Sequence, residues 1–143
     1  MVITVKNFEL RNIAEALSKI DTKNLKVSTG FKVAKLVKTF SEALTEFSEA
    51  STEIQKEYVK TDAEGNYIRR KSVVEKADGT KEEVDTNEVE FDNIPELNAK
   101  LVELSNVEIE VTTPVFLSST EFDEAGLRLD LQTLFILEPL FKD

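Results

Sequence analysis

Residues 31–58 read FKVAKLVKTFSEALTEFSEASTEIQKEY, and this stretch decides the fold. From Val33 onward, positions 37, 40, 44, 47, 51, 54 and 58 follow in alternating steps of four and three, and Ser51 alone breaks their apolar character. That spacing is the 3.5-residue period of a coiled-coil-like seam. Because Gly and Pro are absent between Phe31 and Glu64, the sequence predicts one helix of about 28 residues, roughly 40 Å long.

Shorter helices are expected on both sides of the long one. Asn7 is expected to cap the first of them, Asn93 and Glu96 form a capping pair for a later one, and Asp130 caps the last. Each carries an apolar stripe that can cover the long helix. The positions expected in this core are Leu10, Ile13, Leu17, Leu97, Leu101, Leu104, Leu131, Leu134 and Phe135, with Phe8 and Phe31 closing one end.

The remaining segments favour short strands. Val2 to Lys6 is β-prone, and residues 107–111 alternate apolar and polar side chains, which is the pattern of a strand with one wet face. Residues 61–84 combine two turn signals with runs too polar to bury, so we expect an exposed hairpin projection there. Tyr58 and Tyr67 flank its base and are expected to form a cross-strand pair.

Together these elements predict an α+β fold. One long central helix carries shorter helices packed on it, with a few short antiparallel strands and the projecting hairpin. A chain of 143 residues has the size of one ordinary domain, so residues 1–143 are expected to form a single domain. Uninterrupted apolar runs reach only about four residues, which favours a cytoplasmic protein with no membrane partner.

The composition excludes several kinds of chemistry. His, Cys and Trp are absent, which removes thiol and Ser–His nucleophiles, Cys/His zinc sites and disulfides. Residues 62–66 lack the ligand alternation of a calcium loop, and the acidic run from Glu82 to Asp92 is typical of a solvated surface. We therefore expect no catalytic, cofactor-binding or metal-binding residue and no cofactor. A metal-dependent enzyme built on carboxylates stays open as an alternative.

Charge is distributed unevenly along the chain. The net charge is −10, but residues 1–40 carry eight basic and three acidic groups (+5), whereas residues 41–143 carry ten and 25 (−15). One interpretation is a solvated surface whose lysines meet carboxylates of the same chain. The other is a partner-binding surface. For that second interpretation the candidate residues are Lys32, Lys35, Lys38, Glu46, Glu49, Glu53, Ile54 and Tyr58.

Four short motifs resemble a known group of proteins. They are Lys6-Asn7-x-Glu9-Leu10-x-Asn12, Phe31-Lys32-x-Ala34-Lys35, the turn from Tyr58 to Gly65, and Leu137-Glu138-Pro139-Leu140. In this order they look like small accessory proteins encoded by tailed phages of Gram-positive bacteria. The resemblance implies a phage-encoded protein of the host cytoplasm, or one associated with the virion, without assigned catalysis. It implies no functional residue.

The function expected from these observations is surface binding without catalysis. The protein would be a virion-assembly accessory or an inhibitor of a host system, and its partner another protein from the host or the phage. A second copy of the chain stays open as a partner. Direct binding to nucleic acid is disfavoured, because a net charge of −10 repels phosphate. An acidic nucleic-acid mimic that blocks a basic groove of a host protein is the alternative.

Overall fold

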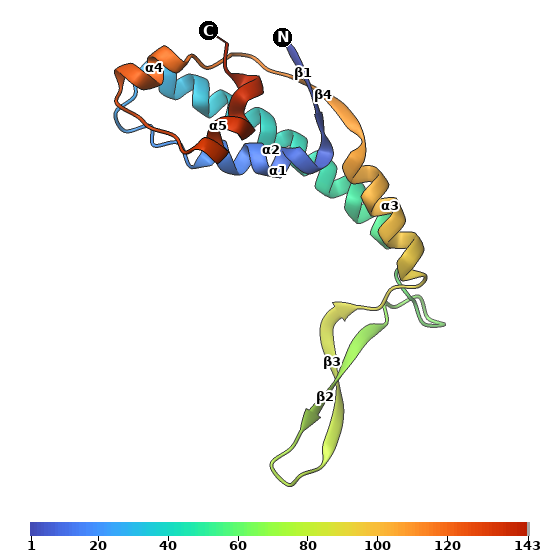
Figure 1. Ribbon diagram of the computed structural model, residues 1–143. Coiled ribbons are helices and arrows are strands. Elements are labelled where there is room, and N and C mark those ends of the chain that lie inside the picture. Colours follow the sequence, from blue (N-terminus) through green and yellow to red (C-terminus); the bar gives the residue numbers. More distant parts are fainter. Residues whose placement is uncertain (143) are drawn as a thin grey trace. The chain divides into compact units, whose positions relative to one another are not determined.

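The structure, a computed structural model, describes residues 1–142, apart from the side chains at positions 85 and 87 (Figure 1). The mixed α+β fold class is confirmed. In chain order the elements are β1 (Val2–Lys6), α1 (Asn7–Ser18), α2 (Val27–Lys56), β2 (Arg69–Glu75), β3 (Lys81–Val89), α3 (Ile94–Asn106), β4 (Glu108–Thr112), α4 (Ser119–Glu124), α5 (Leu131–Leu137) and the 3₁₀ helix η1 (Glu138–Leu140).

The chain forms two compact units. Unit 1 comprises Met1–Glu49 and the chain from Glu103 onward, and unit 2 comprises Ala50–Val102. The helices α2 and α3 each contain residues of both units.

Unit 1 holds most of the apolar core. Strands β1 and β4 pair antiparallel, with Val2 opposite Thr112 and Lys6 opposite Glu108. Val5 and Val111 point from this small sheet into the core, while their neighbours along each strand are more exposed, as the alternating pattern predicts. The core further contains Leu10, Ile13, Ala16, Leu17, Ile20, Leu25, Val33, Leu36, Phe40, Leu117, Phe122, Leu137 and Leu140.

The long helix α2 is confirmed, but its buried face differs from the predicted seam. Val33 and Phe40 are buried as expected, and Leu36, which the seam omits, is fully buried. Val37, in the seam, is only half-buried. The reason is that a helix facing a globular core buries a stripe about 100° wide, which is broader than the two-position seam of a coiled coil.

Three expected contributors to the core lie at the surface instead. Leu131 and Phe135 of α5 are 67% and 66% exposed, and Leu134 is also exposed. The helix has only seven residues, and Leu137, about 200° around the axis from Phe135, supplies its fully buried side chain. Phe8 and Phe31 are likewise exposed, so the prediction that they close the core is wrong.

The first helix is capped differently from the prediction. Lys6 precedes α1, and its backbone N–H donates to the Glu9 carboxylate at 2.7 Å. Asn7 is the first helical residue and is buried, so its side chain is not the cap. At α5 the predicted cap is confirmed, because the Thr133 N–H donates to Asp130 Oδ1 at 2.7 Å.

Unit 2 contains the β2–β3 hairpin. Strand β3 continues to Val89, five residues past the predicted end at Val84, because the acidic run pairs with β2 as far as Arg69. Asp78 stabilises the turn by accepting hydrogen bonds from the Thr80 N–H and hydroxyl at 3.0 and 2.6 Å. Thr61, and not Tyr58, is the bridge partner of Tyr67, so the predicted tyrosine pair is wrong.

Candidate functional site

The sequence-predicted binding residues are divided between the two units. Lys32, Lys35, Lys38, Glu46 and Glu49 belong to unit 1, and Glu53, Ile54 and Tyr58 belong to unit 2. All except Tyr58 lie on α2.

Two of the three predicted lysines of α2, Lys32 and Lys38, have carboxylate partners within unit 1. Lys32 Nζ lies 2.9 Å from Glu121 Oε1 of α4, and both side chains are largely covered, with 34% and 25% of their surface exposed. Lys38 lies 3.9 Å from Glu42, one turn along the same helix. Lys35 is exposed. For Lys32 and Lys38, the geometry therefore matches the interpretation in which the lysines meet carboxylates of the same chain.

The glutamates of α2 face solvent. Glu42, Glu46 and Glu49 follow in steps of four and three, so they lie on one side of the helix, and all three are exposed. Glu53, in unit 2, lies 3.1 Å from Lys56. Glu46 and Glu49 thus form an exposed pair of carboxylates about one helical turn apart.

Tyr58 is fixed within unit 2. Its hydroxyl donates to Glu96 Oε1 at 3.0 Å, and Lys100 Nζ lies 5.2 Å from the centre of its ring. Lys100 also lies 3.6 Å from Glu57. The interactions with Tyr58 come first among the causes that raise the pKa of Lys100 above 10.5, and Glu57 and Glu96 act in the same direction. Ile54, one turn before Tyr58, is half-buried.

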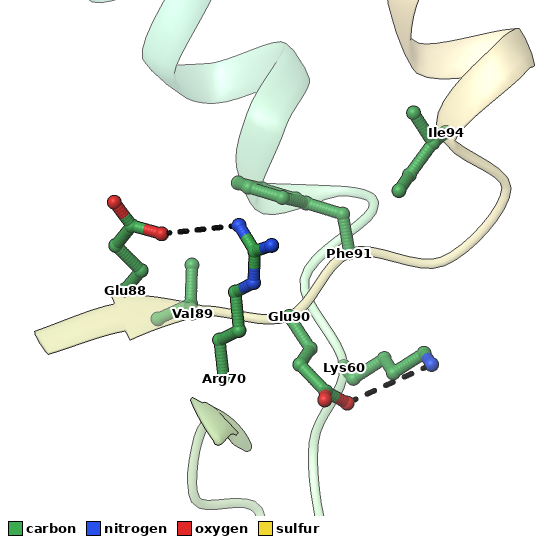
Figure 2. A pocket seen from close by; sticks show the side chains of 7 residues that line it. All are labelled: Lys60, Arg70, Glu88, Val89, Glu90, Phe91 and Ile94. Carbon is green, nitrogen blue, oxygen red and sulfur yellow. Dashed lines mark hydrogen bonds and ion pairs between the residues drawn. The ribbon is translucent and has the colours of Figure 1, made fainter. Parts of the chain in front are cut away.

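A cavity of about 680 Å³ lies beside β2 and β3 in unit 2, and we call it the hairpin cleft (Figure 2). Its apolar lining consists of Val89, Phe91 and Ile94, of which Ile94 is 53% exposed. Its charged lining consists of two ion pairs, Arg70–Glu88 at 3.4 Å and Lys60–Glu90 at 3.7 Å. Figure 2 shows Arg70 reaching from β2 past Val89 toward Phe91.

Backbone hydrogen bonds hold the segments that line the cleft. The Lys60 N–H donates to the Glu90 carbonyl, the Ile68 N–H donates to the Lys60 carbonyl, and the Glu90 N–H donates to the Ile68 carbonyl, each at 2.9 Å. The Val59–Phe91 bridge continues this pairing. The segments around Lys60, Ile68 and Glu90 are therefore tied together, and the apolar side chains are positioned by backbone hydrogen bonds rather than by a large core.

No family model, curated protein or solved structure matches this chain.

A second concave surface, the aromatic groove, lies on unit 1. Its volume is about 310 Å³, and the residues that line it are Thr4, Val5, Phe8, Glu9, Asn12, Ile13, Phe135, Ile136 and Pro139. Phe8 and Phe135 are both exposed here. The sequence carries one signal of this surface. Residues 131–137 read LQTLFIL, and at about 100° per residue the five apolar side chains are spread too widely around the helix axis to be buried together against one core.

Among the residues that the structure describes, no group of three or more acidic, His or Cys side chains is placed to hold a metal ion. Within the same residues, none of the helices combines the length and apolarity needed to cross a bilayer.

Proposed function

We propose that this chain is a non-enzymatic interaction protein that binds a segment of another protein in the hairpin cleft. The make-up of the cleft carries this proposal. Phe91 and Ile94 offer apolar surface that an entering side chain of the partner would cover, and burial of such surface is the main source of affinity between proteins. Concave apolar sites edged by a few polar groups are the usual form of ligand pockets.

The charges of the cleft favour a peptide over other ligands. Glu88 and Glu90 lie beside Arg70 and Lys60, so both signs are present and paired. The two carboxylates would repel a phosphate backbone or an anionic membrane. A peptide that carries both positive and negative side chains can form ion pairs with the acidic and the basic residues of the cleft. We therefore infer a protein partner, with no direct binding to nucleic acid or membrane.

The proposal includes a phage origin. Its support is the resemblance of the Lys6–Asn12 motif and the other three motifs to accessory proteins of tailed phages. On this view the protein acts in the cytoplasm of the infected cell, as a virion-assembly accessory or as an inhibitor of a host system.

The test compares two variants that remove exposed aliphatic surface. Ile94→Ala removes apolar lining of the cleft, and Val27→Ala removes a side chain that is 76% exposed in unit 1. The immobilised proteins are exposed to lysates of phage-infected Gram-positive cells, and retained proteins are quantified by mass spectrometry. We expect a protein that wild type and Val27→Ala retain equally and that Ile94→Ala retains at least tenfold less. Equal retention by all three would contradict the cleft as the binding site.

The exposed carboxylates of α2 favour one other candidate function. Glu46 and Glu49, with Glu42 beside them, could imitate phosphates and occupy a basic groove of a host protein. Such a complex would weaken steeply with added salt and would be lost in the double variant Glu46→Gln/Glu49→Gln. Binding in the cleft would instead respond to Ile94→Ala and less to salt.

A further inference from the structure

The outer edge of β2 is open in the part of the chain that the structure describes. β2 pairs with β3 on one side, and the two strands form a sheet of their own. Every side chain of β2 is exposed, including Val73 at 61% and Val74 at 47%. An isolated two-stranded sheet is marginally stable, and an open edge can accept another strand.

The segment Lys71–Glu75 reads KSVVE and pairs with β3 in regular register, beyond the irregularity between Arg69 and Lys71. In an antiparallel pair of two such segments with Val73 at the two-fold axis, Lys71 stands opposite Glu75 of the second copy. Ser72 then stands opposite Val74, and Val73 opposite its own counterpart. Residues 71, 73 and 75 share one face, so that face carries a central valine pair between two ion pairs.

The opposite face of the sheet also gains apolar contact. Val84 stands opposite Ser72 within the hairpin and is 37% exposed. In the paired arrangement Val84, Ser72 and Val74 of the second copy form one row across the sheet. The row brings together apolar side chains that each hairpin alone leaves in water.

The edge of β3 does not have this complementarity. It carries Glu82 and Glu83 side by side, and an antiparallel pair centred on either of them sets glutamate against glutamate. Arg70 of β2 and Lys76, the residue after β2, flank the segment and would face each other across the pair. Each of them already has a carboxylate partner on β3, Arg70 with Glu88 at 3.4 Å and Lys76 with Glu82 at 3.0 Å.

We propose that two copies of this chain pair antiparallel along the outer edges of β2, with Val73 at the two-fold axis, and form a four-stranded sheet. Lys71–Glu75 does not line the hairpin cleft, so this proposal is independent of the function proposed above.

The test uses charge reversal in the full chain. Sedimentation velocity from 5 to 500 μM is expected to show a monomer–dimer equilibrium of the wild type. Lys71→Glu and Glu75→Lys each set like charges against each other and should raise the dissociation constant at least tenfold. An equimolar mixture of the two variants restores opposite charges at both ends of the pair, so heterodimers should form. Changes in the stability of one hairpin cannot produce that rescue.

Backbone amide exchange locates the contact. In the wild type, amides within residues 71–75 should exchange more slowly at 500 μM than at 5 μM, while amides of α1 should not change. A wild type that stays monomeric at 500 μM would overturn the proposal, and so would a mixture that does not associate. Dimerisation that survives both charge variants and is lost in Phe135→Ala would also overturn it, by placing the contact at the aromatic groove. Binding at the hairpin cleft, measured with Ile94→Ala, is expected to be unaffected by any of these results.

Discussion

The side-chain amide of Asn7 donates a hydrogen bond of 2.9 Å to the backbone carbonyl of Leu104, 97 residues further along the chain. Next to it, the Asn7 backbone N–H donates to the Val107 carbonyl at 3.1 Å. The first bond satisfies a carbonyl near the end of α3, and the second continues the pairing of β1 with β4. The buried Asn7 thus ties the junction of β1 and α1 to the end of α3 and the start of β4.

Replacing Asn7 should destabilise unit 1. Asn7→Ala removes the side-chain hydrogen bond to the Leu104 carbonyl, which retains the bond from the Val107 N–H at 3.2 Å. Loss of one such hydrogen bond typically costs about 0.5–1.5 kcal/mol. Asn7→Asp should lower the free energy of unfolding further at pH 7, because the introduced carboxylate would repel the Leu104 carbonyl oxygen. The free energy of unfolding from urea titration measures both losses. Asn12→Asp, on the exposed side of α1, is the matched control and should change little. Equal losses in Asn7→Asp and Asn12→Asp would show that the long-range bond contributes nothing.

Phe40 and Phe135 should differ sharply in their contribution to stability. Phe40 is completely buried against the core of unit 1, so Phe40→Ala is expected to cost about 3–5 kcal/mol, a large part of the total stability of an ordinary domain. Phe135 is exposed on α5, and Phe135→Ala is expected to change the stability by at most about 0.5 kcal/mol. Thermal melts of both variants measure the contrast. A large loss in Phe135→Ala would mean that the aromatic groove is part of the core.

Lys32, through its ion pair with Glu121, should contribute more to the stability of unit 1 than the exposed Lys35, which lies one turn further along α2. Glu121 Oε2 is buried without a hydrogen-bond partner, so loss of Lys32 leaves the carboxylate poorly compensated. Lys32→Ala is expected to cost about 1–2 kcal/mol, and Lys35→Ala close to nothing. A double-mutant cycle with Glu121→Ala should give a coupling energy of about 1 kcal/mol. A cycle without coupling would leave Lys32 available to a partner, as in the second of the two interpretations of the charge pattern.

Acid should weaken the cap of α5. Hydrogen bonds from the Thr133 backbone and then its side chain lower the pKa of Asp130 below its usual 3.8. The carboxylate therefore titrates at lower pH when folded than when unfolded. Its stabilisation is fully present above pH 3.8 and is lost as the pH falls through the folded value. Asp130→Asn keeps a cap but cannot titrate, so the stability difference between wild type and this variant should shrink below pH 4 and stay constant above pH 5. A constant difference throughout would exclude the effect.

Local patterns predicted the elements of this protein well. Alternation at Ile109 and Val111 gave a strand, and the apolar spacing between Val33 and Phe40 gave the long helix, because these periods report the local backbone directly. Asn7 shows the limit. An asparagine between a strand and a helix is typical of a helix N-cap. In this structure the Asn7 side chain is instead buried and donates to the Leu104 carbonyl, a contact that the local sequence cannot reveal.

Surfaces were harder to predict because they depend on which segments meet. The apolar positions of α5 could face the core or the solvent, and Leu137 is the one that is fully buried. The hairpin cleft is lined by residues from position 60 to position 94. The bridge between Val59 and Phe91 brings the two ends of this range together. The sequence around neither residue shows a periodic pattern that would predict that contact.

The β2 strand should be the first part of the chain that trypsin cleaves. Arg69, Arg70 and Lys71 are exposed, and among the residues that the structure describes β3 is the only strand paired with β2, so local opening there breaks few contacts. Lys35 is also exposed but lies within α2, which is anchored by the buried Phe40. Digestion at low protein concentration, followed by mass spectrometry, should therefore give first cuts at residues 69–71 or at Lys76, with the helical fragments intact. First cuts at Lys35 would reverse this assignment. At 500 μM the same cuts should slow, because a second copy paired along β2 would have to dissociate before the strand can enter the protease.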